Sequence, residues 1–91
     1  MEIRHLGSFV AAAELGSFTR AAGAQGITQA AISQHVALLE GELKVSLFKR
    51  LGRGVQLTDR GQQLYEHARQ ILELVERAAD EVGNVRRPLS G

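Results

Sequence analysis

Hydroxyl, amide and alanine side chains gather between Gly16 and Glu40, a stretch with no acidic residue before Glu40 itself. Ser17 and Thr28 each stand directly before a run of helix-compatible residues, where a hydroxyl can accept from the unpaired N–H groups of a first turn. Gly16 and Gly26 fall where the preceding helices must end, because glycine tolerates the left-handed conformation common at such ends. Two helix starts and two helix ends so close together predict a helix-turn-helix, and the chemistry that this motif indicates is DNA recognition.

The start of the second helix of this pair carries side chains that suit base recognition. Partial positive charge and unpaired N–H groups at a helix N-terminus favour nearby phosphates while side chains enter the major groove. Gln29 is the leading base reader, since its amide can form two hydrogen bonds with adenine; the alternative is a solvated first-turn residue. Ala30 and Ala31 can offer methyl contacts to thymine, although alanine is equally a good helix former. Ser33 and Gln34 lie on or beside the outward face, where each can reach a base or a phosphate.

Basic residues are unevenly distributed, although the formal net charge is only +1. Five basic residues and two acidic ones lie between Gly16 and Thr58, whereas the last third of the chain is rich in acids. Arg53 stands between two glycines and has the reach and charge to enter a narrow minor groove; the alternative is a solvated arginine. Lys49 and Arg50 suit phosphate contacts, although Arg50 can instead support the fold through an internal pair. The middle of the chain is therefore expected to face phosphate.

Hydrophobic spacing predicts the elements that must position these side chains. Apolar residues at helical spacing predict an amphipathic helix over residues 2–15 and a short one over about 17–25. A third helix is predicted from Thr28, with apolar residues at intervals of four, three and four along one face. Short apolar runs over 45–50 and 55–57, separated by a glycine-bracketed turn, predict a small β-hairpin.

A long helix with a coiled-coil seam is predicted over residues 59–87. Its apolar residues alternate at four and three positions for three heptads. Such a helix extends about 40 Å, too far to fold back wholly onto so small a core, so we expect its seam to meet a second copy of the chain. The predicted interface consists of Leu64, Ala68, Ile71, Val75, Ala78 and Val82. Arg69, Glu73 and Arg77 are spaced for weak i,i+4 ion pairs on a solvated face, and Pro88 ends the helix.

Composition limits the remaining possibilities. The 91 residues, 44% of them apolar, are enough for one small domain. The absence of cysteine excludes a disulfide framework and a thiolate zinc site, and it fits a reducing compartment, so the cytoplasm is the expected location. No apolar run approaches the roughly 18 residues of a membrane span, so neither export nor membrane insertion is expected.

Catalysis and metal binding are not expected. Ser33, His35 and Glu40 share one helix without a pocket-sized fold around them, which argues against a hydrolase. His5 and His67 are far apart in sequence and have no paired ligand at metal spacing, so no metal or cofactor is assigned. His35 lies nearer the apolar stripe than Gln34 does, and it either flanks the interface or packs against the second helix.

Four segments of the chain resemble the N-terminal domain of LysR-type transcriptional regulators, in the correct order and at the usual spacing. They are Phe9–Ala22, Thr28–Glu40, Leu47–Arg50 and Arg53–Gly61. The resemblance covers nearly the whole chain and implies a mainly α fold, a winged helix-turn-helix with a three-helix core and a β-hairpin wing. A long linker helix follows, two copies of which pack antiparallel to hold a dimer on DNA; the sequence itself indicates a seam but not its direction.

The resemblance also implies roles for individual residues. It puts a base-contacting glutamine at Gln29 and phosphate contacts at Ser17, Thr19, Arg20 and Thr28. Such contacts position a protein on DNA without reading its sequence. A hydroxyl can both cap a helix and contact DNA, so the two roles of Ser17 and Thr28 can coexist.

Four positions depart from the usual family pattern. Gln25 replaces a leucine between the second and third helices, and Ala30 replaces a frequent proline at the start of the recognition helix. Lys44 stands where glycine is common after that helix, and Gln34 stands where some members have arginine. The last three departures are expected to alter DNA contacts rather than the fold.

We therefore expect a winged helix-turn-helix over residues 1–58, a dimerisation helix over 59–87 and the start of a hinge over 88–91. The expected partners are double-stranded promoter DNA and a second copy of the chain, with a tetramer implied for a longer protein that carries the family's effector domain. The competing hypothesis is a protein-interaction module in which the seam is the function and the helix-turn-helix is only a compact cap. It predicts no salt-dependent DNA binding.

Overall fold

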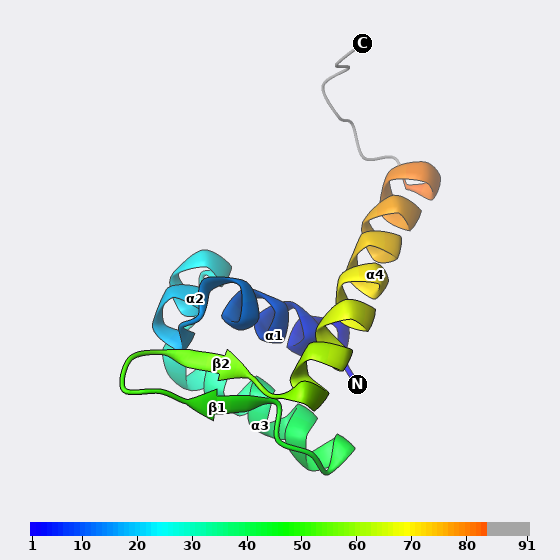
Figure 1. Cartoon of the computed structure of the whole chain (residues 1–91). Helices are drawn as coiled ribbons and strands as arrows, with labels where there is room; N and C mark the ends of the chain where they lie inside the picture. Colours follow the sequence, from blue (N-terminus) through cyan, green and yellow to red (C-terminus); the bar gives the residue numbers. More distant parts are fainter. Residues whose placement is uncertain (84–91) are drawn as a thin grey trace.

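The computed structural model describes residues 1–83, so the predicted last residues of the linker helix and the hinge at 88–91 lie outside the described range. Four helices and a two-stranded antiparallel sheet follow one another along the chain (Figure 1). Their bounds are α1 (Ile3–Leu15), α2 (Phe18–Gln25), α3 (Gln29–Leu43), β1 (Phe48–Arg50), β2 (Val55–Leu57) and α4 (Asp59–Val82). The winged helix-turn-helix predicted from the sequence is confirmed.

Hydroxyl caps begin three of the helices, as the sequence predicted for Ser17 and Thr28. Ser17, Thr28 and Thr58 each accept a hydrogen bond from the backbone N–H three residues later, at 3.0–3.1 Å. Gly16 ends α1 in the left-handed conformation, with φ of 65°. Lys44 ends α3 in the same conformation, with φ of 59°, which accounts for the usual glycine at this place in the family pattern. The turns that orient α2 and α3 are therefore set by local capping.

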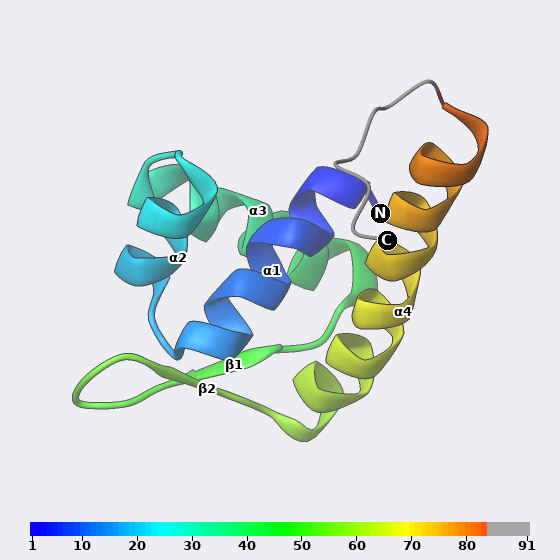
Figure 2. The same ribbon diagram turned by 90° about the horizontal axis from the view of Figure 1, so that it is seen from above.

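The hydrophobic core has two parts, which meet at α1 and Phe48. One part joins α1, α2, α3 and β2, and the other joins α1, α3 and the first half of α4. The Phe48 ring packs against both, with its centroid 5.4 Å from those of Phe9 and Phe18. In both ribbon views α1 lies between α2 and α4, and the hairpin projects beyond the helical core on the side away from α4 (Figures 1 and 2). The core thereby holds the wing beside the helix-turn-helix.

The first strand is shorter than predicted. It begins at Phe48 rather than at residue 45, and it pairs with β2 in the register Phe48–Leu57 to Arg50–Val55. Leu47 is fully buried and its N–H donates to the Glu40 carboxylate at 2.8 Å, while its carbonyl accepts from Thr58 at 3.0 Å. The bond from Thr58 continues the hairpin register by one pair, but the Leu47 N–H is bonded to α3 instead, so the ladder is incomplete at this residue.

The long helix begins at Asp59 as predicted, and within residues 1–83 it ends at Val82; the predicted residues 84–87 lie outside the described range. Gly83 follows in an extended conformation, with φ of −79° and ψ of 164°. Glycine is among the weakest helix formers, which fits the end of α4 before this residue. The 24 residues of α4 span about 36 Å.

His35 has a structural role, as one of the predicted alternatives required, but it packs against α1 rather than against the second helix. Its Nδ1 lies 2.7 Å from the Ser8 hydroxyl in a hydrogen bond, and its ring stacks on that of His5 with centroids 4.6 Å apart. Burial lowers the pKa of His35, as do the charges of His5 and Arg4, whereas Glu2 acts in the opposite direction. A neutral His35 ring is therefore favoured where α3 crosses α1.

Candidate nucleic-acid interface

The N-terminal turns of α2 and α3 lie side by side. Thr19, in the first turn of α2, donates from its hydroxyl to the Gln29 amide oxygen at 3.0 Å. Gln29 is the first residue of α3, and neither helix has an acidic residue in its first turn. Two positive helix ends and two sets of unpaired N–H groups therefore face the same surface, which suits anions such as DNA phosphates.

The predicted base readers occupy the exposed beginning of α3. Gln29, Ala30 and Gln34 are exposed, and Ser33 is half-buried beside them. Ala31, the other alanine considered for thymine contact, is half-buried. The opposite side of the helix is anchored in the core, where Ile32 is fully buried. The structure thus places all four predicted base-contacting positions of α3 at one end of a helix that is anchored in the core.

The wing is fastened to the turn between α1 and α2. The Val55 N–H donates to the Gly16 carbonyl at 3.0 Å, and the Leu51 N–H donates to the Gly54 carbonyl at 3.1 Å across the hairpin turn. Gly54 has φ of 72°, and a Cβ at that position would overlap the Gly16 carbonyl oxygen. Backbone therefore meets backbone where the wing joins the helix-turn-helix, and only glycine fits there.

Basic side chains of the wing and of α2 surround the helix starts. Arg53 is exposed at the hairpin turn and lines a shallow hollow together with Arg20 and Ser17. The Arg50 guanidinium lies over the Phe18 ring, 4.9 Å from its centroid, so the predicted internal support through Arg50 is a cation–π contact. Lys49 is exposed on the same strand.

A second hollow joins the wing to the two helix starts, and its lining includes Ser17, Thr19, Gln29 and Arg50. Ser17, Thr19, Arg20 and Arg50, together with Gln29 and Arg53, therefore line two neighbouring hollows that share Ser17, whereas Lys49 lines neither of them. Thr28 lies next to Gln29, because it is the N-cap residue of α3.

The two acidic residues of the basic segment lie at the other end of α3. Glu40 accepts from the Leu47 N–H, and Glu42 pairs with the N-terminal ammonium group at 2.7 Å. Glu42 is about 20 Å from Gln29 along the helix axis. Acidic charge is therefore kept away from the start of α3.

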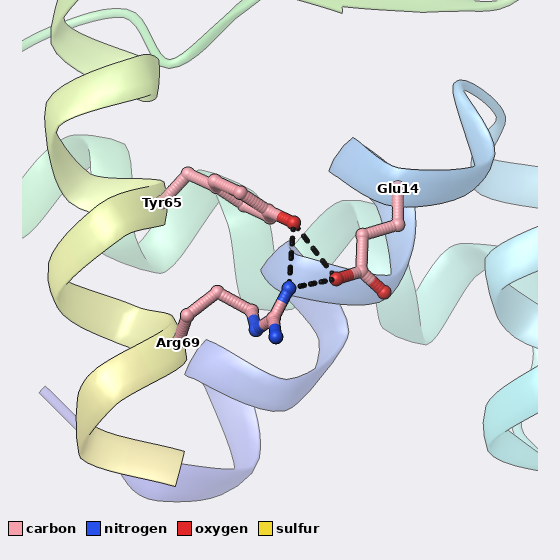
Figure 3. A network of polar contacts seen from close by, with 3 residues as sticks. All are labelled: Glu14, Tyr65 and Arg69. Atoms are coloured by element: carbon pink, nitrogen blue, oxygen red, sulfur yellow. Dashed lines mark hydrogen bonds and ion pairs between the residues drawn. The ribbon is translucent and has the colours of Figure 1, made fainter. Parts of the chain in front are cut away.

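A polar cluster connects α4 to the end of α1 (Figure 3). The Tyr65 hydroxyl donates to the Glu14 carboxylate at 2.8 Å, and Arg69 Nη1 lies 3.1 Å from both groups. The hydrogen bond to Tyr65, followed by the charges of Tyr65 and Glu14, raises the pKa of Arg69 above its ordinary value. The predicted i,i+4 pairing was therefore wrong for Arg69, which reaches across to α1, and within residues 1–83 no ion pair forms between Glu73 and Arg77.

The predicted dimer seam divides into a buried part and an exposed part. Leu64 and Ala68, at 9% and 0% exposure, belong to the chain's own core, and Ile71 packs partly against it. The prediction of a dimer interface at Leu64 and Ala68 is therefore wrong, because the first half of α4 uses them to cover α1. Val75 and Val82, at 42% and 87% exposure, remain open, as does Ala78.

The sequence did not indicate the roles of four residues in the structure. Leu74, which lies off the heptad pattern, is 59% exposed beside the open part of the seam. Glu14 and Tyr65 were not singled out, because nothing in their spacing indicates that α1 and α4 meet there. The function of Gly54 was also missed, although a glycine in a hairpin turn is a usable signal.

Comparison with known proteins identifies the family. Residues 3–62 match the family described as "Bacterial regulatory helix-turn-helix protein, lysR family". The chain belongs to the LysR family. It is the helix-turn-helix DNA-binding domain of such a regulator rather than an enzyme.

Individual relatives agree with this assignment. The chain is 46% identical over 91 residues to the HTH-type transcriptional regulator BudR of Klebsiella aerogenes, covering all of this chain and 64% of the relative. It is 50% identical over 91 residues to the nitrogen assimilation regulatory protein nac of Escherichia coli K12, of which it covers 30%. The LysR-type chain thus spans only part of these curated relatives.

A solved structure of a CbnR_DBD–DNA complex has the same fold. It superimposes with a TM-score of 0.83 at 41% identity, covering 88% of this chain and 92% of that one.

Two features of other classes of protein are absent from the described residues. No group of three or more His, Cys, Asp or Glu side chains in residues 1–83 is arranged to hold a metal ion. None of the helices in the same range combines the length and the apolar character needed to cross a membrane.

Proposed function

We propose that this LysR-type domain binds an interrupted palindromic promoter site as a homodimer, with α3 in the major groove and the wing in the minor groove. The observation that carries the proposal is that two helix N-termini, neither with an acidic residue in its first turn, meet at Gln29. Arg53 lies on the wing that is fastened beside them. Gln29, Ala30, Ser33 and Gln34 contact bases from the start of α3. Arg53 enters the minor groove.

Residues around these readers hold the phosphate backbone. This role belongs to Ser17, Thr19, Arg20, Thr28, Lys49 and Arg50. Arg50 has the least freedom among them, since its guanidinium is held over the Phe18 ring. Similarity to the domain in a CbnR_DBD–DNA complex supports DNA as the ligand of this surface. A protein with this role acts where the bacterial chromosome is, in the cytoplasm.

The homodimer uses the exposed second half of α4. Val75, Ala78 and Val82, together with Leu74, leave apolar surface that the chain does not cover itself. Residues 1–58 then form the DNA-binding unit, and α4 holds two such units at a fixed spacing. Low net charge makes dimerisation and base contacts important for affinity, because few phosphate contacts are available. A tetramer is proposed only for a longer protein with an effector domain.

Binding of purified variants to preferred and altered duplexes tests this assignment. Gln29→Ala is expected to relax preference at one position per half-site by roughly 1–3 kcal/mol. Lys49→Ala is the matched control, since loss of a phosphate contact weakens binding to all sequences alike and reduces the salt slope by about 1. Equal losses for Gln29→Ala on preferred and random DNA would refute its role as a base reader.

A further inference from the structure

The hydrogen bond between Thr19 and Gln29 is not explained by a phosphate-contacting role for Thr19. The Thr19 hydroxyl donates to the Gln29 amide oxygen at 3.0 Å, and both side chains are exposed. The bond joins the first turns of two separate helices. From this contact we infer that Thr19 is a positioning residue that holds the Gln29 amide in place for base recognition. This inference rests on the proposed role of Gln29.

The Thr19 hydroxyl is itself held firmly. The preceding residue, Phe18, is 6% exposed, and the Ser17 cap fixes the first turn of α2 through its bond to the Arg20 N–H. Threonine also has few side-chain rotamers, because it is branched at Cβ. The hydroxyl therefore occupies a nearly fixed point beside the start of α3.

Gln29 gains order from this fixed neighbour. A glutamine at an exposed helix start has several accessible rotamers, and fixing such a side chain on binding weakens affinity by roughly 3- to 10-fold. A bond already present in the free protein removes part of that cost. The benefit appears only on DNA whose base uses the Gln29 amide, so loss of this bond is expected to change base preference, whereas loss of a phosphate contact by Thr19 weakens binding to all duplexes alike.

Positioning by Thr19 is compatible with base reading. An amide oxygen accepts two hydrogen bonds, so Gln29 Oε1 can keep its bond from Thr19 while it accepts another from adenine. Because the amide group is planar, holding its oxygen also orients its nitrogen, which can donate to adenine N7. Removal of the hydroxyl would leave one acceptor position of Oε1 without its partner where DNA excludes water.

Five variants of the chain separate this positioning role from a phosphate contact. Thr19→Val removes the hydroxyl with little change of shape, Thr19→Ser retains it, and Thr19→Ala repeats the removal with a strong helix former. Gln29→Ala is made alone and together with Thr19→Val. Dissociation constants are measured on the preferred duplex and on duplexes altered at the position where Gln29→Ala relaxes preference. Circular dichroism checks that each variant is folded.

The expected result is a loss of discrimination in Thr19→Val and Thr19→Ala of roughly 3- to 10-fold at the Gln29 position only. Thr19→Ser keeps discrimination within about twofold, and Thr19→Val has no further effect in the Gln29→Ala background. If Gln29→Ala relaxes preference but Thr19→Val weakens all duplexes equally or none, the positioning role is overturned. If Gln29→Ala itself leaves preference unchanged, the base-reading role fails, and the inference fails with it.

Discussion

Gly54→Ala is the substitution that most sharply tests how the wing is attached. Gly54 has φ of 72°, a conformation in which alanine costs about 1–2 kcal/mol. The added Cβ would overlap the backbone oxygen of Gly16, so the hairpin must move and the 3.0 Å bond between the Val55 N–H and that oxygen is lost, at about 1 kcal/mol. The free energy of unfolding is therefore expected to fall by about 2–3 kcal/mol in total.

Urea denaturation followed by circular dichroism measures this loss, and Gly52→Ala is its matched control. A Cβ at Gly52 would meet no atom within 4 Å, and its φ is not in the left-handed region. That variant is expected to stay within about 0.5 kcal/mol of the parent or to gain slightly, since alanine restricts the unfolded chain. Gly54→Ala is also expected to weaken DNA binding, because Arg53 moves with the hairpin. Equal unfolding midpoints for the two variants would refute the account of wing attachment.

Three other outcomes follow from the contacts of α4 and α1. Val75→Asp is expected to convert dimers to monomers in sedimentation velocity with little loss of stability. Leu64→Asp should instead lower the urea midpoint, because Leu64 is buried. A dimer that survives Val75→Asp would place the interface elsewhere. Tyr65→Phe removes exposed hydrogen bonds of the hydroxyl, so the free energy of unfolding should fall by about 1 kcal/mol or less in urea titrations. A fall of several kcal/mol would contradict the weak contribution assigned to this cluster. Because the pKa of His35 is lowered in the fold, its contribution to stability is complete above the ordinary value of 6.5 and declines as the pH falls below it. His35→Gln should flatten that part of the profile, and an unchanged slope would exclude His35 as the cause.

The local signals in the sequence were sufficient for most of the fold. Ser17 and Thr28 cap their helices as predicted, since an N-cap depends only on residues within one turn. The apolar face of α3 was likewise evident from spacing, with Ile32 and Leu39 fully buried. The positions of the predicted DNA-contacting residues around one surface follow from these local elements and from the family pattern.

The sequence pattern could not predict contacts between elements that lie far apart in the chain. A continuous seam did not indicate that Leu64 and Ala68 cover α1 while Val75 remains exposed, because heptad spacing is the same for both kinds of packing. The partner of Arg69 was misassigned for a similar reason, since Glu14 is 55 residues away in the chain. The Thr19–Gln29 bond depends on how two helices meet, which no spacing within either helix specifies.

Selection of bound duplexes from a random DNA library, at fixed near-physiological salt, tests the central claim most directly. A dimer that reads bases from the start of α3 predicts enrichment of a two-fold motif, with half-sites about one helical turn or more apart. Gln29→Ala carried through the same selection should lose preference at one position in each half-site. A folded, dimeric protein that enriches no motif would contradict the account and favour a role in protein interaction.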